Sequence, residues 1–206
     1  MTNVGAAGGR RMTLVSALQA LHASRRSQEV VITTMGSARE WMTLGAPHAL
    51  DIVLVPSAMG HGTSIGLGLA LARPRNRVVV CSGDGSLLMN LGSLTSIIAA
   101  GAANLVVIVF DNGVYEVTGA QPTAAATGGA NGRGADFCGI ARACGFDSVY
   151  RFRHAAEWSA RVREVLDASG PTFVALDVEP VIGGTAPTSP GPAAARARAF
   201  MEALQR

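Results

Sequence analysis

Polar residues that suit phosphate and metal binding follow two apolar segments of the chain. Gly83-Asp84-Gly85-Ser86 comes directly after Val78–Ser82, and Asp111-Asn112-Gly113 comes directly after Leu105–Phe110. Glycines on both sides of Asp84 allow the backbone to approach a ligand closely, and such a turn before a helix offers N–H groups to phosphate. A carboxylate and an amide oxygen suit Mg²⁺, which commonly takes one or two protein side chains together with substrate phosphates. Alone, a Gly-Asp-Gly sequence is more typical of a plain tight turn, since Gly and Asp dominate turns.

The elements around these residues bring them together. Val78–Ser82 and Leu105–Phe110 are apolar without interruption, which is typical of parallel strands covered on both faces. The residues between them, Leu91–Ala100, have the pattern of a helix. A strand, helix and parallel strand form a right-handed crossover, in which both strands end at the same edge of the sheet. Asp84 and Asn112 are therefore predicted to face one ligand at that edge.

Helix and strand patterns alternate along the rest of the chain, which predicts an α/β fold: a doubly wound, mainly parallel six-stranded sheet with helices on both faces. Residues 113–135 are rich in Gly, Ala and Thr and are predicted to be a functional or flexible loop. We expect a flexible N-terminus at 1–11, one domain at 12–182, and a Pro/Gly linker with a C-terminal helix at 183–206. The further strands are expected at Val30–Thr34, Asp51–Val55 and Phe173–Val178, and the further helices at Gly60–Ala72, Asp136–Cys144, Ala155–Ala168 and Ala193–Gln205.

Composition excludes several classes of protein. The 206 residues are 49% hydrophobic and 15% charged, which excludes a disordered chain, and the net charge of +3 is too small to indicate a nucleic acid partner. The longest apolar strings are far shorter than a membrane span. Three cysteines cannot form a disulfide framework, and as unpaired thiols they agree with a reducing cytoplasm, where we expect the protein to be.

The segment after Arg10-Arg11 has two interpretations. A basic pair followed by an apolar stretch resembles an export signal, but polar residues interrupt this stretch. Met12, Val15, Leu18 and Leu21 recur at helical spacing, so an amphipathic surface helix is the favoured prediction.

Residues 83–112, which open with Gly-Asp-Gly and close with Asn, resemble the cofactor motif of the thiamine diphosphate enzymes. Two further segments, TTMGSAREW at 33–41 and PSAMGHGTSIGLGLAL at 56–71, resemble family segments in the same order, so that the resemblance covers roughly residues 12–180. The resemblance implies a site for thiamine diphosphate and Mg²⁺. It assigns the metal ion to Asp84, the Asn112 side chain and the Val114 backbone carbonyl.

The resemblance also assigns the remaining cofactor contacts. The turn with Gly83, Gly85 and Ser86 would bind the diphosphate, with further contacts from Gly36 and Ser37. Met59 matches the apolar wedge that bends the cofactor, and Ser57 matches the residue whose carbonyl receives the aminopyrimidine. Without this resemblance, Met59 is more typical of core packing.

DNGVYEVTGAQPT at 111–123 and MGHGTSIGLGLAL at 59–71 resemble the phosphonopyruvate and sulfopyruvate decarboxylases, and chains of this length resemble the β subunit of the latter. The resemblance implies decarboxylation of a small anionic 2-oxoacid to an aldehyde and CO₂. The glutamate that activates the cofactor belongs, in the family, to a pyrimidine-binding domain, and no residue here is assigned to it. We therefore expect a separate pyrimidine-binding (α-type) partner subunit in a hetero-oligomer of α2β2 or higher. The alternatives are an acetolactate-synthase-like or benzoin-type carboligase subunit, and a non-catalytic module that binds thiamine diphosphate or a nucleotide.

Three more residues are weaker candidates for a role in the reaction. His61 could contact a substrate carboxylate or serve as an acid, and is equally interpreted as a helix-start histidine without such a role. Glu116, with Tyr115, is a candidate for closing over substrate, although a solvent-exposed loop position is favoured for it. Arg39 could bind an anionic substrate group, but a pair with Glu40 is the favoured prediction.

Overall fold

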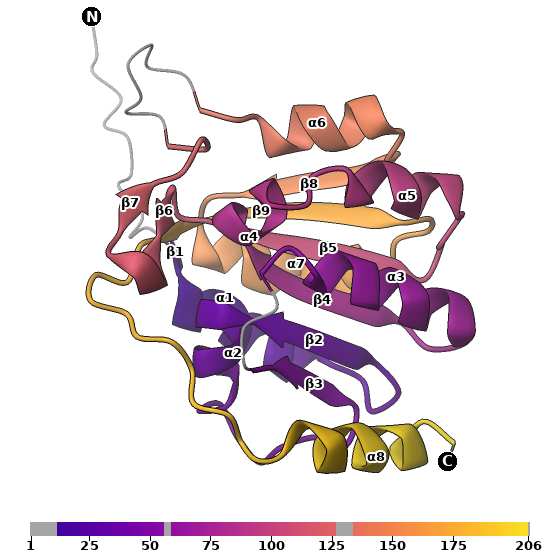
Figure 1. Ribbon diagram of the computed structural model, residues 1–206. Coiled ribbons are helices and arrows are strands. Elements are labelled where there is room, and N and C mark those ends of the chain that lie inside the picture. Colours follow the sequence, from indigo (N-terminus) through magenta and orange to yellow (C-terminus); the bar gives the residue numbers. More distant parts are fainter. Residues whose placement is uncertain (1–11, 56–58, 127–133, 206) are drawn as a thin grey trace, which may run out of the picture.

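The structure is a computed structural model, and it describes residues 12–55, 59–126 and 134–205. Its centre is one parallel sheet of seven strands, in the order β1-β9-β5-β4-β2-β3, with β8 also pairing with β9 (Figure 1). The strands of this sheet are β1 Met12–Thr13, β2 Val30–Thr34, β3 Asp51–Leu54, β4 Val78–Gly83, β5 Leu105–Asp111, β8 Ser148–Phe152 and β9 Thr172–Glu179.

Helices cover both faces of the sheet (Figure 1). Side chains from α3, α4, α5, α6 and α8 form one apolar layer with the sheet, and side chains from α1, α2 and α7 form the other. The helices are α1 Leu14–Ser24, α2 Met35–Trp41, α3 Gly62–Ala72, α4 Asp84–Leu88, α5 Ser93–Ala99, α6 Phe137–Cys144, α7 Ala155–Asp167 and α8 Ala193–Ala203.

The strand β4 shows why continuous apolar runs arise here. Val78 and Val80 pack into the layer of α3 and α5, whereas Val79 and Cys81 pack into the layer of α1 and α7. Successive side chains of a strand point to opposite faces, so a strand covered on both faces needs apolar residues at every position. The predicted α/β sheet with helices on both faces is thus confirmed.

The central sheet has two strands, β1 and β8, beyond the five that the sequence pattern identified, which makes seven where six were expected. β8 was missed because its side chains are mostly half-buried and Arg151 is exposed, so that it lacks a continuous apolar run. β1 was missed because it has only two residues. Met12 lies in this strand and not in the first helix, which begins at Leu14 after a capping box between Thr13 and Ser16.

The helix α3 lies unusually close to the sheet. A Cβ atom on Gly66 would be 2.3 Å from Cγ2 of Val80 and 3.2 Å from Cδ1 of Leu105. A Cβ atom on Gly62 would be 3.0 Å from Cγ2 of Thr34, near the end of β2. The glycines therefore allow the start of α3, and with it Met59, to lie beside the ends of β2 and β4.

The C-terminal residues return to the sheet. α8 lies beside β3 (Figure 1), and Phe200 contributes to the apolar core. The Arg196 guanidinium donates to the carbonyls of Val53 and Val55, at 2.6 and 2.5 Å. α8 therefore supplies donors to carbonyl groups at the edge of the sheet. Within the part of the chain that is described, no helix combines the length and apolarity needed to cross a membrane.

Candidate active site

A cavity at the carboxyl ends of the central strands contains most of the residues singled out from the sequence. Gly83 pairs with Phe110 across β4 and β5, so the segments that follow these two strands begin side by side. α2 begins directly after β2, the other neighbour of β4. Of the predicted site residues, those that line the cavity are Gly36, Ser37, Met59, Gly83, Asp84, Gly85, Ser86, Asn112, Val114 and Glu116.

Asp84 places a buried carboxylate in this cavity. The residue is 1% exposed, and its Oδ2 accepts a hydrogen bond of 2.7 Å from the Thr123 hydroxyl. Burial raises the pKa of Asp84, while the Thr123 hydroxyl and the backbone amides of Gly85 and Gly113 act in the opposite direction. These donors are all neutral. A buried carboxylate whose donors are neutral is a favourable ligand for a cation, because the cation compensates the charge that burial makes costly.

Asn112 lies at the end of β5 with both ends of its amide engaged. Its Oδ1 accepts from the backbone N–H of Val114 at 2.9 Å, and its Nδ2 donates to Oε1 of Glu116 at 2.7 Å. Gly113 between them has φ +74°, a conformation that favours glycine and turns the chain back toward the Asn112 side chain. The amide oxygen keeps a second lone pair for another partner.

The donors that the family resemblance assigns to Mg²⁺ fit that ion chemically. They are a carboxylate, an amide oxygen and a backbone carbonyl, and Mg²⁺ prefers oxygen ligands. Among the described residues there is no group of three or more His, Cys, Asp or Glu side chains that could hold a metal ion. The oxygen donors of the cavity therefore suit a hard cation.

The Gly83–Ser86 turn has free space beside Gly83, whereas the Tyr115 ring covers Gly85. A Cβ atom on Gly83 would have no atom within 4 Å, whereas one on Gly85 would be 2.4 Å from Cε1 of Tyr115. Ser86 accepts a hydrogen bond of 3.0 Å from the backbone N–H of Gly60, which ties the turn to the segment before α3. The cavity volume is about 70 Å³. Ligand pockets usually measure roughly 300–1,000 Å³, so the space enclosed by this chain alone is small for a ligand.

The start of α2 forms another wall of the cavity. Ser37 accepts from the backbone N–H of Thr34 at 3.0 Å, and its hydroxyl lies 2.8 and 2.9 Å from the carbonyl oxygens of Thr34 and Cys81. The Ser37 hydroxyl is therefore occupied by the backbone. Met35, also at the cavity, has φ +48°, which is rare for a residue with a side chain. Strained backbone of this kind is concentrated at functional sites.

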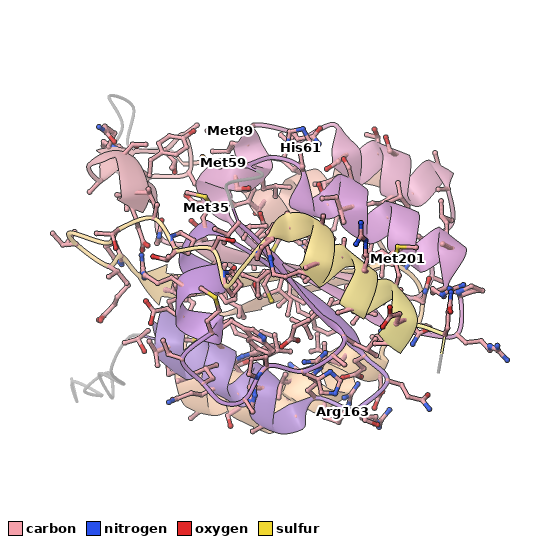
Figure 2. The ribbon with its side chains drawn as sticks, turned by 60° about the horizontal axis from the view of Figure 1, so that its bottom comes forward. Met35, Met59, His61, Met89, Arg163 and Met201 are labelled. Carbon is pink, nitrogen blue, oxygen red and sulfur yellow. The ribbon has the colours of Figure 1, made fainter. Side chains whose placement is uncertain are left out.

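Figure 2 labels two residues of the 56–71 segment, Met59 and His61. Met59 is half-buried and lines the cavity together with Met35. His61, at the start of α3, is exposed, and its Nδ1 lies 3.0 Å from the carbonyl oxygen of Met59. The structure does not bring His61 to the cavity, because α3 starts outside it. Ser57 lies outside the described residues.

The prediction that Glu116 occupies a solvent-exposed loop position is wrong. The Glu116 side chain is 7% exposed, and its Oε1 accepts from the Val181 backbone N–H at 2.9 Å as well as from Asn112. Its Oε2 lies 3.7 Å from Nη2 of Arg39. The reason is tertiary. The residues after Asn112 fold back as a short hairpin of β6 Val114–Tyr115 and β7 Gln121–Pro122, and the chain after β9 passes alongside.

Arg39 makes the predicted pair with Glu40, at 2.7 Å, and two contacts that the sequence did not indicate. Besides its approach to Glu116, it donates to the Thr185 carbonyl at 2.9 Å. The contribution of Thr123 was missed in the same way, because it lies nearly forty residues from Asp84 in the sequence and no spacing signal connects them. The β6–β7 hairpin brings Thr123 to Asp84, and the Thr123 backbone N–H donates to the Gly113 carbonyl at 2.9 Å.

Asp111, next to Asn112, lies in a second cluster of charges at the same edge. Burial and the nearby charge of Asp84 raise the pKa of Asp111 to about 6, with Asp177 adding to the shift and Arg151 opposing it. Nη2 of Arg151 is 3.2 Å from Oδ2 of Asp111 and 2.7 Å from Oδ1 of Asp177. This cluster anchors the ends of β5 and β9 beside the cavity.

Comparison with known proteins relates most of the chain to one family. Residues 23–176 match the family described as the thiamine pyrophosphate enzyme, C-terminal TPP binding domain. A phosphonopyruvate decarboxylase from Streptomyces viridochromogenes is 37% identical over 195 residues, which are 93% of this chain and 47% of that protein. A sulfopyruvate decarboxylase subunit beta from Methanothermobacter thermautotrophicus is 40% identical over 123 residues, 60% of each protein.

A solved structure is similar at the level of the fold. It is a putative thiamin diphosphate-dependent enzyme from Mycobacterium smegmatis, with a TM-score of 0.67 and 20% sequence identity, and the match covers 88% of this chain and 35% of that one. The chain spans about half the length of the phosphonopyruvate decarboxylase it matches and 60% of the sulfopyruvate decarboxylase subunit.

Proposed function

This chain belongs to the thiamine pyrophosphate enzyme family through its C-terminal TPP binding domain, and from that premise we propose that it is the cofactor-binding subunit of a two-component decarboxylase. The proposed substrate is a small anionic 2-oxoacid, and the proposed products are an aldehyde and CO₂. The observation that carries the proposal is that Asp84, Asn112 and the Gly83–Ser86 turn line one cavity at the strand ends. Ligands of doubly wound sheets bind in this region.

Different residues of the cavity would bind different parts of the cofactor. Asp84, the Asn112 oxygen and the Val114 carbonyl would hold Mg²⁺, and the Gly83–Ser86 turn would hold the diphosphate. Gly36 and Ser37 contribute from the start of α2; because the Ser37 hydroxyl is engaged with the backbone, its contact with the cofactor would come from its backbone. When bound, thiamine diphosphate supplies the electron sink for loss of CO₂.

The chain's own part in the reaction is to bind, orient and exclude water. Met59 presents an apolar side chain to the cavity, which supports its assignment as the wedge between the two rings. Ser57 is assigned the contact with the aminopyrimidine. The low exposure of Asp84 and Glu116 keeps the metal end of the site away from water, where charge interactions are stronger.

The substrate class and the partner come from the relatives. Phosphonopyruvate and sulfopyruvate are 2-oxoacids with a second anionic group, and the proteins named for them are 37% and 40% identical to this chain. The relative that is named as a subunit supports a partner chain that binds the pyrimidine end of the cofactor. We propose an assembly of two or more copies of each subunit.

Calorimetry with thiamine diphosphate and Mg²⁺, on the chain purified with its partner subunit, tests the cofactor site. Asp84→Asn and Asn112→Ala should each weaken Mg²⁺-dependent binding at least tenfold, because each removes a proposed ligand of the ion. Asp147→Asn, at an exposed position, serves as the matched control. Binding that ignores both substitutions, or binding of ATP in place of thiamine diphosphate, would contradict the proposal.

Product analysis tests the reaction. An aldehyde and CO₂ from phosphonopyruvate or sulfopyruvate are expected. An acyloin as the main product would instead identify a carboligase, which uses the same cofactor site.

A further inference from the structure

We propose that Glu116 sets the orientation of the Asn112 side-chain amide, so that the oxygen and not the nitrogen is presented to the metal ion. This makes Glu116 a positioning residue, which acts through Asn112 and not on the substrate. The inference rests on the proposed function, because it requires Asn112 to be a metal ligand.

The two hydrogen bonds of the Asn112 amide agree on one orientation. An N–H group, from Val114, lies 2.9 Å from the position taken by Oδ1, and a carboxylate oxygen, from Glu116, lies 2.7 Å from the position taken by Nδ2. If the amide were flipped, the NH₂ group would face the Val114 N–H and the carbonyl oxygen would face the Glu116 carboxylate. Both contacts would be repulsive, since a donor would face a donor and an acceptor an acceptor.

Orientation matters because only one end of an amide binds a metal ion. The amide oxygen has lone pairs for Mg²⁺, whereas the NH₂ group has donors only. Of the two hydrogen bonds that orient the amide, the one to the Glu116 carboxylate is the stronger, because hydrogen bonds to an ionised acceptor are shorter and stronger than those between neutral groups. Partners of metal ligands commonly fix the geometry of the ligands in this way.

Besides Asn112, two parts of the chain contact Glu116, the segment after β9 and the helix α2. Its Oε1 also accepts from the Val181 backbone N–H at 2.9 Å, and its Oε2 lies 3.7 Å from Nη2 of Arg39. A Cβ atom on Gly36 would be only 3.1 Å from Oε2, so the α2 backbone closes the remaining side. With 7% of its side chain exposed, Glu116 has one position, which fits a residue that orients another.

The test compares Glu116→Gln with Glu116→Met in the assembled protein. Both side chains match glutamate closely in length, but only glutamine keeps an oxygen that accepts from Asn112 and Val181. The Mg²⁺ affinity is measured by titrating the metal at a fixed thiamine diphosphate concentration. Glu157→Met, at an exposed position on α7, is the control. Glu116→Met should weaken Mg²⁺ binding by about 10–100-fold, as is usual for partners of metal ligands, and Glu116→Gln should stay within about threefold of the parent protein.

A second readout separates orientation from general damage to the site. At saturating Mg²⁺, the affinity of the Glu116→Met protein for thiamine diphosphate should recover, because excess metal selects the correct amide orientation. A collapsed site would not recover. If Glu116→Met does not fold, as judged by thermal unfolding of the metal-free protein, Glu116→Asp takes its place. It withdraws the oxygen by one methylene and should show the same loss.

Two outcomes would overturn the inference. One is a Glu116→Met protein that binds Mg²⁺ as tightly as the Glu157→Met control. The other is a Glu116→Gln protein with normal Mg²⁺ affinity but no turnover, which would make Glu116 a catalytic residue. Neither affects the proposed function, which is tested separately by the substitutions of Asp84 and Asn112 and by product analysis.

Discussion

Single side chains in the cavity are arranged by contacts over long sequence distances. Asp84 accepts a hydrogen bond from Thr123, which directly follows the β6–β7 hairpin. Glu116 accepts one from the backbone N–H of Val181, which follows β9. Tyr115, which lies between Val114 and Glu116 in the sequence, has its ring against Gly85. Contacts of this kind can be tested by single substitutions that change the free energy of unfolding.

Gly85→Ala should displace the Tyr115 ring, because the new Cβ atom would be 2.4 Å from Cε1 of Tyr115. The expected loss in the free energy of unfolding is about 1–3 kcal/mol, the usual cost of overpacking. In a Tyr115→Ala background the same change should be close to neutral, since the obstacle is gone. Urea unfolding of the four proteins measures both effects, and equal losses in the two backgrounds would contradict this contact.

The buried Asp111 predicts a pH dependence of stability. Its pKa is about 6 in the folded protein, against 3.8 for an ordinary aspartate, so the folded state binds the proton more tightly than the unfolded chain. The stability contributed by this group is therefore fully present below about pH 4 and is lost as the pH rises to about 6.

Substitution of Asp111 by asparagine should remove this dependence. Between pH 4 and pH 6, the metal-free parent protein should lose up to about 3 kcal/mol of unfolding free energy relative to Asp111→Asn. Denaturant unfolding in a chelator at several pH values measures the difference. Parallel curves for the two proteins would show that Asp111 has an ordinary pKa.

Among the elements, the helix α3 can pack closely on the sheet because it has glycine at the positions of closest approach. It packs on β4 and β5 through Gly66, and its start positions Met59 at the cavity. The seven-residue α2 and the five-residue α4 start directly after β2 and β4, so that both begin at the cavity. At Gly83–Ser86 the local sequence has the composition of a turn, because glycine and aspartate dominate turns, but in the structure a helix begins at Asp84.

Two glycines of α3 form a matched pair for a test of this packing. Gly66→Ala should lower the free energy of unfolding by about 1–3 kcal/mol, since its Cβ atom would be 2.3 Å from Val80. Gly68→Ala should raise it by about 0.5–1 kcal/mol, because alanine favours a helix and no atom lies within 4 Å of the new Cβ. Chemical denaturation measures the free energy of unfolding of both variants, and changes of the same sign at the two positions would contradict the close packing of α3.

At the scale of the whole molecule, the cavity joins segments from nearly the full length of the domain. Residues of α1, α2, β4, α4, β5 and β9 line it, together with Met59 from the segment before α3. A ligand that bridges these segments binds the folded state only, so the proposed cofactor should act as a stabiliser of the entire fold.

Thiamine diphosphate with Mg²⁺, at a concentration one hundred times the dissociation constant, should add about 2.7 kcal/mol to the free energy of unfolding. Addition of a chelator should reverse the effect, because the diphosphate loses its metal. Thermal unfolding with and without each component measures this. An equal shift with thiamine diphosphate alone would argue against a metal-dependent site.

Much of this molecule follows from its sequence because local patterns report burial. The five strands expected from apolar runs, among them Val30–Thr34 and Leu105–Phe110, are present within one or two residues, since a strand covered on both faces must be apolar throughout. The proximity of Asp84 and Asn112 was also predictable, because a right-handed crossover places consecutive parallel strand ends together.

Only the tertiary structure decides the surroundings of these two residues. The burial of Glu116, the hydroxyl of Thr123 on Asp84 and the exposure of His61 all depend on how distant segments return to the sheet edge. Such contacts produce no periodic pattern in a sequence, because any distant segment that folds against a side chain can contact it. The residue types thus establish which chemistry is available, and the packing of the hairpin and the C-terminal residues establishes how those groups are oriented.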